Sequence, residues 1–170
     1  DNILIMKTMV EKRYYVKSII SPGSGMMSPA FVKQLGKAAE YWVGSAPRAT
    51  HPKLPGILQV SEAYQKRFGH PMPDLAVLGY HGVMCLREAL EIAGSDDPDK
   101  VRSAYSKMYV PPGQKGNHNH YPWKFDETGQ NPEAHSMVSQ IIDGKLMTVW
   151  PSDYAERDFI YPIPSWEKRL

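Results

Sequence analysis

The chain has 170 residues, enough for one domain or two small ones. Lysine and arginine total 20 against 18 aspartates and glutamates, and the resulting formal charge of +2 excludes a polybasic nucleic-acid binder. Hydrophobic residues make up 42% and aromatic residues 11%, which excludes a disordered chain, and no apolar run reaches the roughly 18 residues of a membrane span.

The first expected element is a helix at the very start of the chain. Apolar residues at positions 3, 6, 9 and 10 lie on one side of a helix. A domain rarely starts inside an amphipathic helix with nothing before it. We therefore expect Asp1 to be an internal point of a longer polypeptide, and a trimmed but complete domain is the alternative.

A strand, a helix and a second strand follow. Val16–Ile20 is short and rich in β-branched residues, which predicts a strand. Ser28 and Pro29 have the residue types of a helix N-cap and first turn, and Gly36 is a plausible end of that helix. Tyr41–Val43 predicts the second strand. A β-α-β unit of this kind favours an α/β fold with a parallel sheet and flanking helices.

The middle of the chain is predicted to be helical. Residues 46 to 55 contain three prolines and form a connector. Helical spacing of apolar residues predicts a helix over Ile57–Phe68 and another over Leu75–Ala93. The second is nearly all apolar, with Arg87, Glu88 and Glu91 on one narrow arc. It is therefore expected to be mostly buried, with one edge facing solvent.

Turn signals increase towards the C-terminus. Asp97-Pro98 is a cap and first-turn proline, which predicts a third helix. Residues 111 to 122 are predicted to form a loop. Asp143-Gly144 lies between two apolar segments, Val138–Ile142 and Leu146–Trp150, and this pattern predicts a β-hairpin. The tail from residue 161 to 166 is expected to be extended.

A glycine-containing loop is the most informative local motif. Gly23, Ser24 and Gly25 lie between the first predicted strand and the helix that starts at Ser28. Loops at this point of an open α/β sheet line ligand crevices, and free N–H groups at a helix start favour a carboxylate or another anion. The spacing is not that of a dinucleotide fingerprint. A tight turn without a ligand is the alternative.

The sequence gives little support for a metal site, a cysteine nucleophile or a catalytic acid pair. His118 and His120 lack a third ligand at a diagnostic spacing, so we interpret them as solvent-exposed loop histidines and predict no metal site and no cofactor. The only cysteine, Cys85, lies in an apolar helix without a nearby positive charge and is expected to be a small core residue. Asp96-Asp97 and Asp126-Glu127 are interpreted as a cap and a turn. With no residues to name as catalytic, the chain is not expected to be an enzyme.

Tyr80 is a second candidate for ligand contact. Gly79 precedes it, and His81 and Gly82 follow it at the start of the apolar helix. An aromatic ring beside glycines at a helix start can point into a cleft and stack on a ligand. Ordinary packing is the alternative.

Four stretches in the same order carry a resemblance to a known family. They are Ile19–Phe31, Leu78–Ser95, Asp97–Ala104 and Phe125–Pro151. Together they make the chain similar to the C-terminal half of ABC transporter substrate-binding proteins of the branched-chain amino-acid (leucine/isoleucine/valine-binding) family. The resemblance implies a type I periplasmic-binding fold, in which two α/β lobes with parallel sheets and flanking helices close on a small ligand. This chain would be an incomplete, C-terminal part of that fold.

The resemblance also implies how the chain is divided. Residues 1–48 would form the β-α-β segment of the second lobe with its ligand loop, and residues 49–110 a helical segment of the first lobe. Residues 111–170 would return to the second lobe as its closing hairpin and C-terminal tail. By position, Gly23, Ser24 and Gly25 fall on the ligand loop of the second lobe, and Tyr80 and His81 on the first-lobe side of the cleft.

The function implied is that of an extracytoplasmic or periplasmic receptor. It would bind a small organic molecule and deliver it to an ABC permease in the membrane, without nucleic acid or cofactor. A missing N-terminal part of the same polypeptide would complete the pocket. A ligand-sensing domain of a receptor or regulator on the same fold, or a small α/β enzyme, are the alternatives.

Two departures from the family bear on the ligand. Amino-acid binders of the family commonly carry an acid on the loop that here spans residues 21 to 27, and this loop contains none. His81 stands where the family has an aspartate. A buried ammonium without a partner would be costly. We therefore expect an uncharged or a carboxylate ligand, aromatic ones included, rather than an α-amino acid.

Overall fold

The computed structural model describes residues 2–21, 24–27, 29–45 and 48–170. The chain forms two compact units: unit 1 contains residues 1–46 and 136–170, and unit 2 contains residues 47–135. The first change of unit lies close to the boundary expected after residue 48. The second follows residue 135, further along the chain than the boundary expected after residue 110, because residues 111–135 pack within unit 2. The assignment of these segments to lobes stays a prediction.

Unit 1 is built on a four-stranded sheet in the order β1-β2-β5-β6. The strands are β1 (Ile19–Ser21), β2 (Trp42–Ser45), β5 (Val138–Ile142) and β6 (Lys145–Trp150). β1 and β2 are parallel, which confirms the predicted β-α-β unit, although β1 is shorter than the expected strand over residues 16–20. β5 is antiparallel to both β2 and β6, so the complete sheet is mixed.

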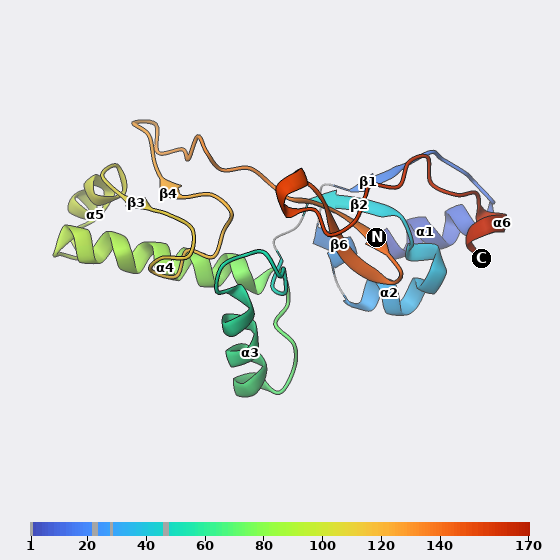
Figure 1. The fold of residues 1–170 in the computed structure, drawn as a ribbon, viewed down its shortest axis with the longest axis horizontal. Coiled ribbons are helices and arrows are strands. Elements are labelled where there is room, and N and C mark those ends of the chain that lie inside the picture. The colour runs from blue at the N-terminus through green and yellow to red at the C-terminus, as the bar shows by residue number, and fades with distance from the viewer. Residues whose placement is uncertain (1, 22–23, 28, 46–47) are drawn as a thin grey trace. The chain divides into compact units, whose positions relative to one another are not determined.

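The helices of unit 1 lie beside its sheet (Figure 1) and share one core with it. They are α1 (Asn2–Glu11), α2 (Pro29–Leu35) and α6 (Trp166–Arg169), with the 3-10 turns η1 (Ser24–Met27), η2 (Gly36–Ala39) and η3 (Ser152–Tyr154). Met6, Phe31, Trp42 and Ile141 are buried in this core. Phe31 meets Trp42 edge to face, with ring centroids 4.9 Å apart. Because α1 and α2 contribute to the same core, both cover the same face of the sheet.

The predicted hairpin is confirmed, and a distant carboxylate holds its turn. Asp143 and Gly144 have φ angles of 53° and 70°, as a primed turn requires. The carboxylate of Glu40 accepts hydrogen bonds from the backbone N–H groups of Asp143 and Gly144, at 3.0 and 2.6 Å. Glu40 therefore joins the end of η2 to the turn between β5 and β6.

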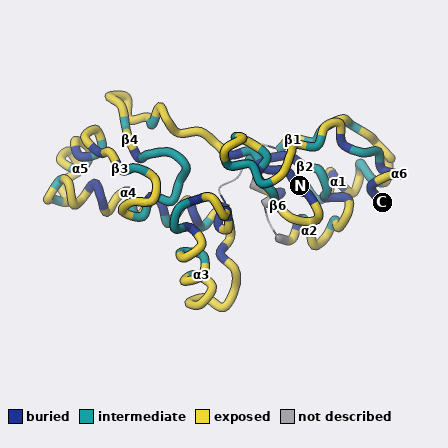
Figure 2. Tube along the Cα trace, in the orientation of Figure 1, coloured by how far each residue is buried: buried dark blue, intermediate teal, exposed yellow. Residues whose placement is uncertain are grey.

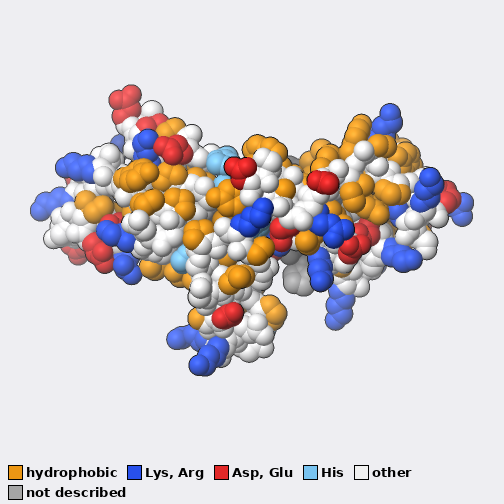
Figure 3. Space-filling model, in the orientation of Figure 1, with side chains coloured by type: hydrophobic (Ala, Val, Ile, Leu, Met, Phe, Trp, Pro, Cys, Tyr) orange, Lys and Arg blue, Asp and Glu red, His pale blue; other side chains and the backbone are white. Residues whose placement is uncertain are grey.

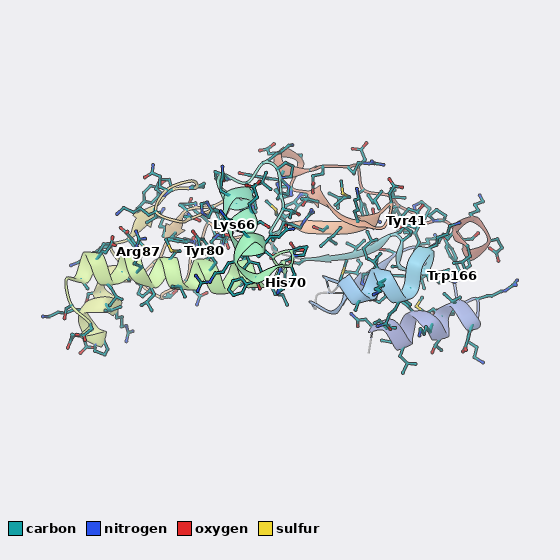
Figure 4. The ribbon with its side chains drawn as sticks, turned by 90° about the horizontal axis from the view of Figure 1, so that it is seen from below. Tyr41, Lys66, His70, Tyr80, Arg87 and Trp166 are labelled. Carbon is teal, nitrogen blue, oxygen red and sulfur yellow. The ribbon has the colours of Figure 1, made fainter. Side chains whose placement is uncertain are left out.

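The C-terminal end of the chain is fixed to unit 1 by Arg169. Its guanidinium donates to the backbone carbonyls of Ala38, at 3.1 Å, and Glu40, at 2.5 Å. It lies over the rings of Trp166, at 4.1 Å, and Tyr41, at 5.5 Å; both rings are labelled in Figure 4. These contacts satisfy carbonyls at the end of η2 that would otherwise lack intrahelical donors.

The described part of unit 2, residues 48–135, contains three helices and a small ladder. These are α3 (Ile57–Phe68), α4 (Ala76–Ala93) and α5 (Pro98–Tyr105), with β3 (Tyr109–Val110) paired to β4 (Trp123–Lys124). The side chain of Asp97 caps α5, as predicted, by accepting from the N–H groups of Asp99 and Lys100 at 3.1 and 3.0 Å. The core of unit 2 contains Ala89, Ala104, Met108, Val110 and Trp123. The sequence did not predict the β3–β4 ladder.

The expectation that α4 is mostly buried is wrong. Leu78 and Val83 are 56% and 67% exposed, and Figure 2 shows exposed residues alternating with buried ones along α4. Glu88, expected on the wet edge, is only 3% exposed and pairs with Lys115 from the loop after β3. Composition showed that the helix is apolar, but which of its faces is covered depends on segments far away in sequence.

The charged residues on the visible surface are mixed in sign. Figure 3 shows lysine and arginine interspersed with aspartate and glutamate over the face in view. Among the described residues, no helix is both long enough and apolar enough to span a membrane.

Candidate functional site

Met26 anchors η1, the described part of the glycine-containing loop, to the sheet of unit 1. Of its predicted ligand residues, Gly23 lies outside the described residues, as does the proposed cap Ser28. Ser24 begins η1, and Gly25 is exposed within it. Met26 is only 2% exposed, and a Cβ placed on Gly44 of β2 would lie 2.3 Å from its sulfur. The missing side chain at Gly44 therefore lets η1 sit directly on the sheet.

A side chain from α1 occupies the space beside Gly25, so this position has little room for a larger residue. A Cβ at Gly25 would lie 2.6 Å from Nδ2 of Asn2. Asn2 also reaches the hydroxyl of Ser21, the last residue of β1, at 3.5 Å. The side chain of Asn2 thus fills the space beside Gly25, and the role of Gly25 in ligand contact stays a prediction.

The candidate residues of unit 2 are brought together on α4. Tyr80 and His81 lie in its second turn, and their ring centroids are 5.7 Å apart; Tyr80 is labelled in Figure 4. His81 is buried, and its ring meets Trp123 of β4 edge to face at 6.2 Å. Tyr80 is half-buried. The helix places both rings against the loop that connects β3 to β4.

His118 also lies beside Tyr80 and His81, although the sequence predicted a solvent-exposed loop histidine at this position. Its ring stacks on the ring of Tyr80, with centroids 5.6 Å apart and planes 19° apart. The hydroxyl of Tyr80 lies 3.3 Å from its Nε2. Its backbone N–H donates to Nε2 of His81 at 3.3 Å. His118 is half-buried, so its interpretation as a solvent-exposed loop histidine is wrong.

The second loop histidine is also half-buried. The ring of His120 meets that of His135 at right angles, with centroids 4.4 Å apart, and that of Tyr121 at 5.0 Å. Burial, together with His135, lowers the pKa of His120 to about 4. Spacing alone gave no signal for these contacts, because His135 lies 15 residues further along the chain than His120.

Burial also decides the ionisation of His81 and Cys85. The pKa of His81 is lowered to about 4, mainly by burial and further by the neighbouring His118. His81 is therefore neutral at pH 7, and its Nε2 is free to accept the His118 N–H. Burial, with nearby Glu88, raises the pKa of Cys85 to about 11. Cys85 packs beside the unit 2 core, 3.8 Å from the sulfur of Met108, and stays a thiol rather than a nucleophile.

Among the described residues, no group of three or more histidine, cysteine, aspartate or glutamate side chains could hold a metal ion.

A separate hollow of about 650 Å³ lies between α5 and the turn at Phe125–Gly129, with Arg102, Tyr105 and Asp126 in its wall. None of the predicted ligand residues lines it. Asp126 shapes that turn by accepting from the backbone N–H and hydroxyl of Thr128, at 2.9 and 2.6 Å.

Comparison with known proteins shows the family. Residues 3–145 match the family described as periplasmic binding protein. The Leu/Ile/Val-binding protein homolog 7 of Brucella melitensis biotype 1 is 29% identical over 167 residues, which is 95% of this chain and 41% of that protein. The chain thus spans about two fifths of the length of the curated relatives it matches.

Solved structures share the fold. A leucine binding protein of Thermotoga maritima has a TM-score of 0.62 at 21% identity, over 86% of this chain and 40% of that one. A periplasmic binding protein type 1 of Bordetella pertussis has a TM-score of 0.59 at 17% identity, over 87% and 42%. The fold is therefore part of the type I periplasmic-binding fold, as the sequence resemblance implied. The chain belongs to the periplasmic binding protein family, which is a family of binding proteins and not of enzymes.

Proposed function

We propose that the full-length protein containing this chain is the solute-binding component of an ABC importer. It binds a small organic molecule between two lobes in the periplasm or extracytoplasmic space and delivers it to a membrane permease by hinge closure. The observation that carries the proposal is the family match over residues 3–145. The curated relatives' printed name, Leu/Ile/Val-binding protein homolog, supports a solute of amino-acid size.

We assign the ligand contacts of this chain to two groups of residues. Gly23, Ser24 and Gly25 would supply backbone donors from the ligand loop of unit 1. Tyr80 and His81 would supply an aromatic wall and a neutral imidazole from unit 2. The close packing of Met26 on the sheet supports a fixed position for η1, and the buried, neutral state of His81 supports an uncharged wall. Affinity in such a receptor depends on both lobes, because each contributes one side of the cleft.

The charges at these residues favour particular ligands. Residues 21 to 27 contain no acid, and His81 stands where the family resemblance implies an aspartate. An imidazole carries no negative charge, so His81, which is neutral at pH 7, does not neutralise an ammonium group. We therefore propose an uncharged or carboxylate solute, aromatic acids included, in preference to an α-amino acid.

Isothermal titration calorimetry on the full-length protein tests this proposal. Leucine and phenylalanine are compared with 4-methylpentanoic acid and 3-phenylpropionic acid, which keep the side chain and carboxylate but lack the ammonium. We expect at least one acid to bind more tightly than its amino-acid counterpart. Tight leucine binding with no binding of the acids would overturn the ligand preference while leaving the receptor function in place. Failure to bind any small solute would overturn the receptor function.

A further inference from the structure

The hydrogen bonds of His118 define its tautomer. Its Nδ1 lies 2.5 Å from the backbone carbonyl of Pro55. A carbonyl oxygen can only accept, so Nδ1 must carry a proton. In the neutral ring, Nε2 is then an acceptor, and the Tyr80 hydroxyl at 3.3 Å must donate to it. The proton of the Tyr80 hydroxyl is therefore directed at His118.

The surroundings of His118 are shaped to admit its ring. Gly56 follows Pro55 and has a φ of +77°, a conformation that other residues rarely adopt. A Cβ at Gly56 would lie 2.5 Å from Cε1 of His118, so any side chain there would displace the imidazole. The backbone N–H of His118 is held by His81. Contacts from the connector and from α4 thus fix the ring and the backbone of one residue.

We infer that His118 is a positioning residue for ligand binding: it holds the ring of Tyr80 in one orientation through stacking and the hydroxyl hydrogen bond. One face of Tyr80 and the proton of its hydroxyl are committed to His118. What Tyr80 can still offer a ligand is aromatic surface and the lone pairs of its oxygen. The inference rests on the proposed function for the ligand contact, but the arrangement of His118 and Tyr80 is independent of it.

A double-mutant cycle on the full-length protein tests the coupling. His118→Asn keeps a donor near the position of Nδ1 but removes the Nε2 acceptor, and Tyr80→Phe removes the hydroxyl. Each substitution is expected to weaken binding of the best solute from the calorimetry about five- to tenfold. The loss in the double variant should be smaller than the product of the two single losses, because both substitutions remove the hydrogen bond between Tyr80 and His118. A loss of affinity in the double variant equal to the product of the two single losses would overturn the inference.

Two further variants separate positioning from general damage. The side-chain oxygen of His118→Gln can accept from Tyr80, so this variant should bind within about threefold of the natural protein. His70→Asn, at an exposed position of unit 2, is the control and should leave affinity unchanged. A His118→Gln variant that folds but binds as weakly as His118→Asn would contradict the hydroxyl hydrogen bond as the positioning contact.

Nitrogen NMR of histidine side chains gives a readout that needs no ligand. In the full-length protein, the ring signals of His118, assigned by their loss in His118→Asn, should show the Nδ1–H tautomer. Tyr80→Phe should shift the Nε2 signal, because its hydrogen bond is lost. An Nε2–H tautomer, or an Nε2 signal that does not shift in Tyr80→Phe, would overturn the inference. If no solute binds while these signals appear as expected, the proposed function fails and the positioning stands.

Discussion

The imidazole of His81 shows how one buried residue connects stability to pH. Its pKa falls from the ordinary value of 6.5 to about 4, first because of burial and second because of His118. In the unfolded chain the ring is free to take up a proton at its ordinary pKa. Between these two values the unfolded state therefore binds more protons than the folded state, and lowering the pH favours unfolding.

We expect the stability that His81 contributes to be present above about pH 6.5 and to be lost as the pH falls towards about 4. One proton corresponds to a slope of at most about 1.4 kcal/mol per pH unit. His81→Gln keeps an acceptor for the His118 N–H but cannot titrate, so it should flatten this dependence. Urea unfolding of the full-length protein from pH 4 to 7 measures it. The exposed His70→Gln is the control, and an unchanged slope in His81→Gln would contradict the assignment.

At the scale of elements, glycines in unit 1 set how closely the segments approach. Gly44 is in β2, and a Cβ there would lie 2.8 Å from the backbone carbonyl of Ser21 and 2.3 Å from the sulfur of Met26. A backbone atom cannot move aside as a flexible side chain can. Position 144, by contrast, favours glycine because of its φ of +70°. A Cβ placed there would lie 3.9 Å from Val32, which is an ordinary contact.

Gly44→Ala is therefore expected to destabilise the protein by about 1–3 kcal/mol through overpacking between β1, β2 and η1. Gly144→Ala should cost about 1–2 kcal/mol through backbone strain alone. The two variants differ in one further respect: only Gly44→Ala displaces Met26, so only it should weaken solute binding in the calorimetric assay. Unfolding midpoints in urea give the stabilities. Equal binding by both variants would show that the ligand loop does not depend on this contact.

At the scale of the molecule, each unit has its own core. Phe31, Trp42 and Ile141 belong to the core of unit 1, and Ala89 and Trp123 to that of unit 2. The described members of these two cores do not overlap. A change in one core is therefore expected to act first on its own unit, because the contacts that it removes are confined there.

Phe31→Ala removes a fully buried ring in edge-to-face contact with Trp42. We expect a loss of about 3–5 kcal/mol in the stability of the unit that contains it. Hydrogen–deuterium exchange of the full-length protein should show faster exchange in β2 and β5, with little change in α4 and α5. A uniform increase over both units would instead show that they unfold together.

The local elements followed from the sequence because their signals act within a few residues. The capping Asp97, the left-handed turn at Asp143-Gly144 and the apolar spacing of α3 all depend on backbone preference and periodicity, which neighbouring residues determine. The family resemblance rested on the same local motifs and is confirmed. Tyr80 and His81 were selected in this way as candidate ligand residues, and their role stays a prediction.

The tertiary structure alone decided which side chains meet. His118 contacts Tyr80 across 38 residues and Pro55 across 63, and no spacing rule connects such positions. The burial of Glu88 depends on a loop that crosses α4 and brings Lys115 to it. Caps, turns and helical faces are properties of a short segment, so the sequence determined them. The state of His81, the partner of Tyr80 and the covered face of α4 depend on burial by distant segments, and burial exists only once the chain has folded.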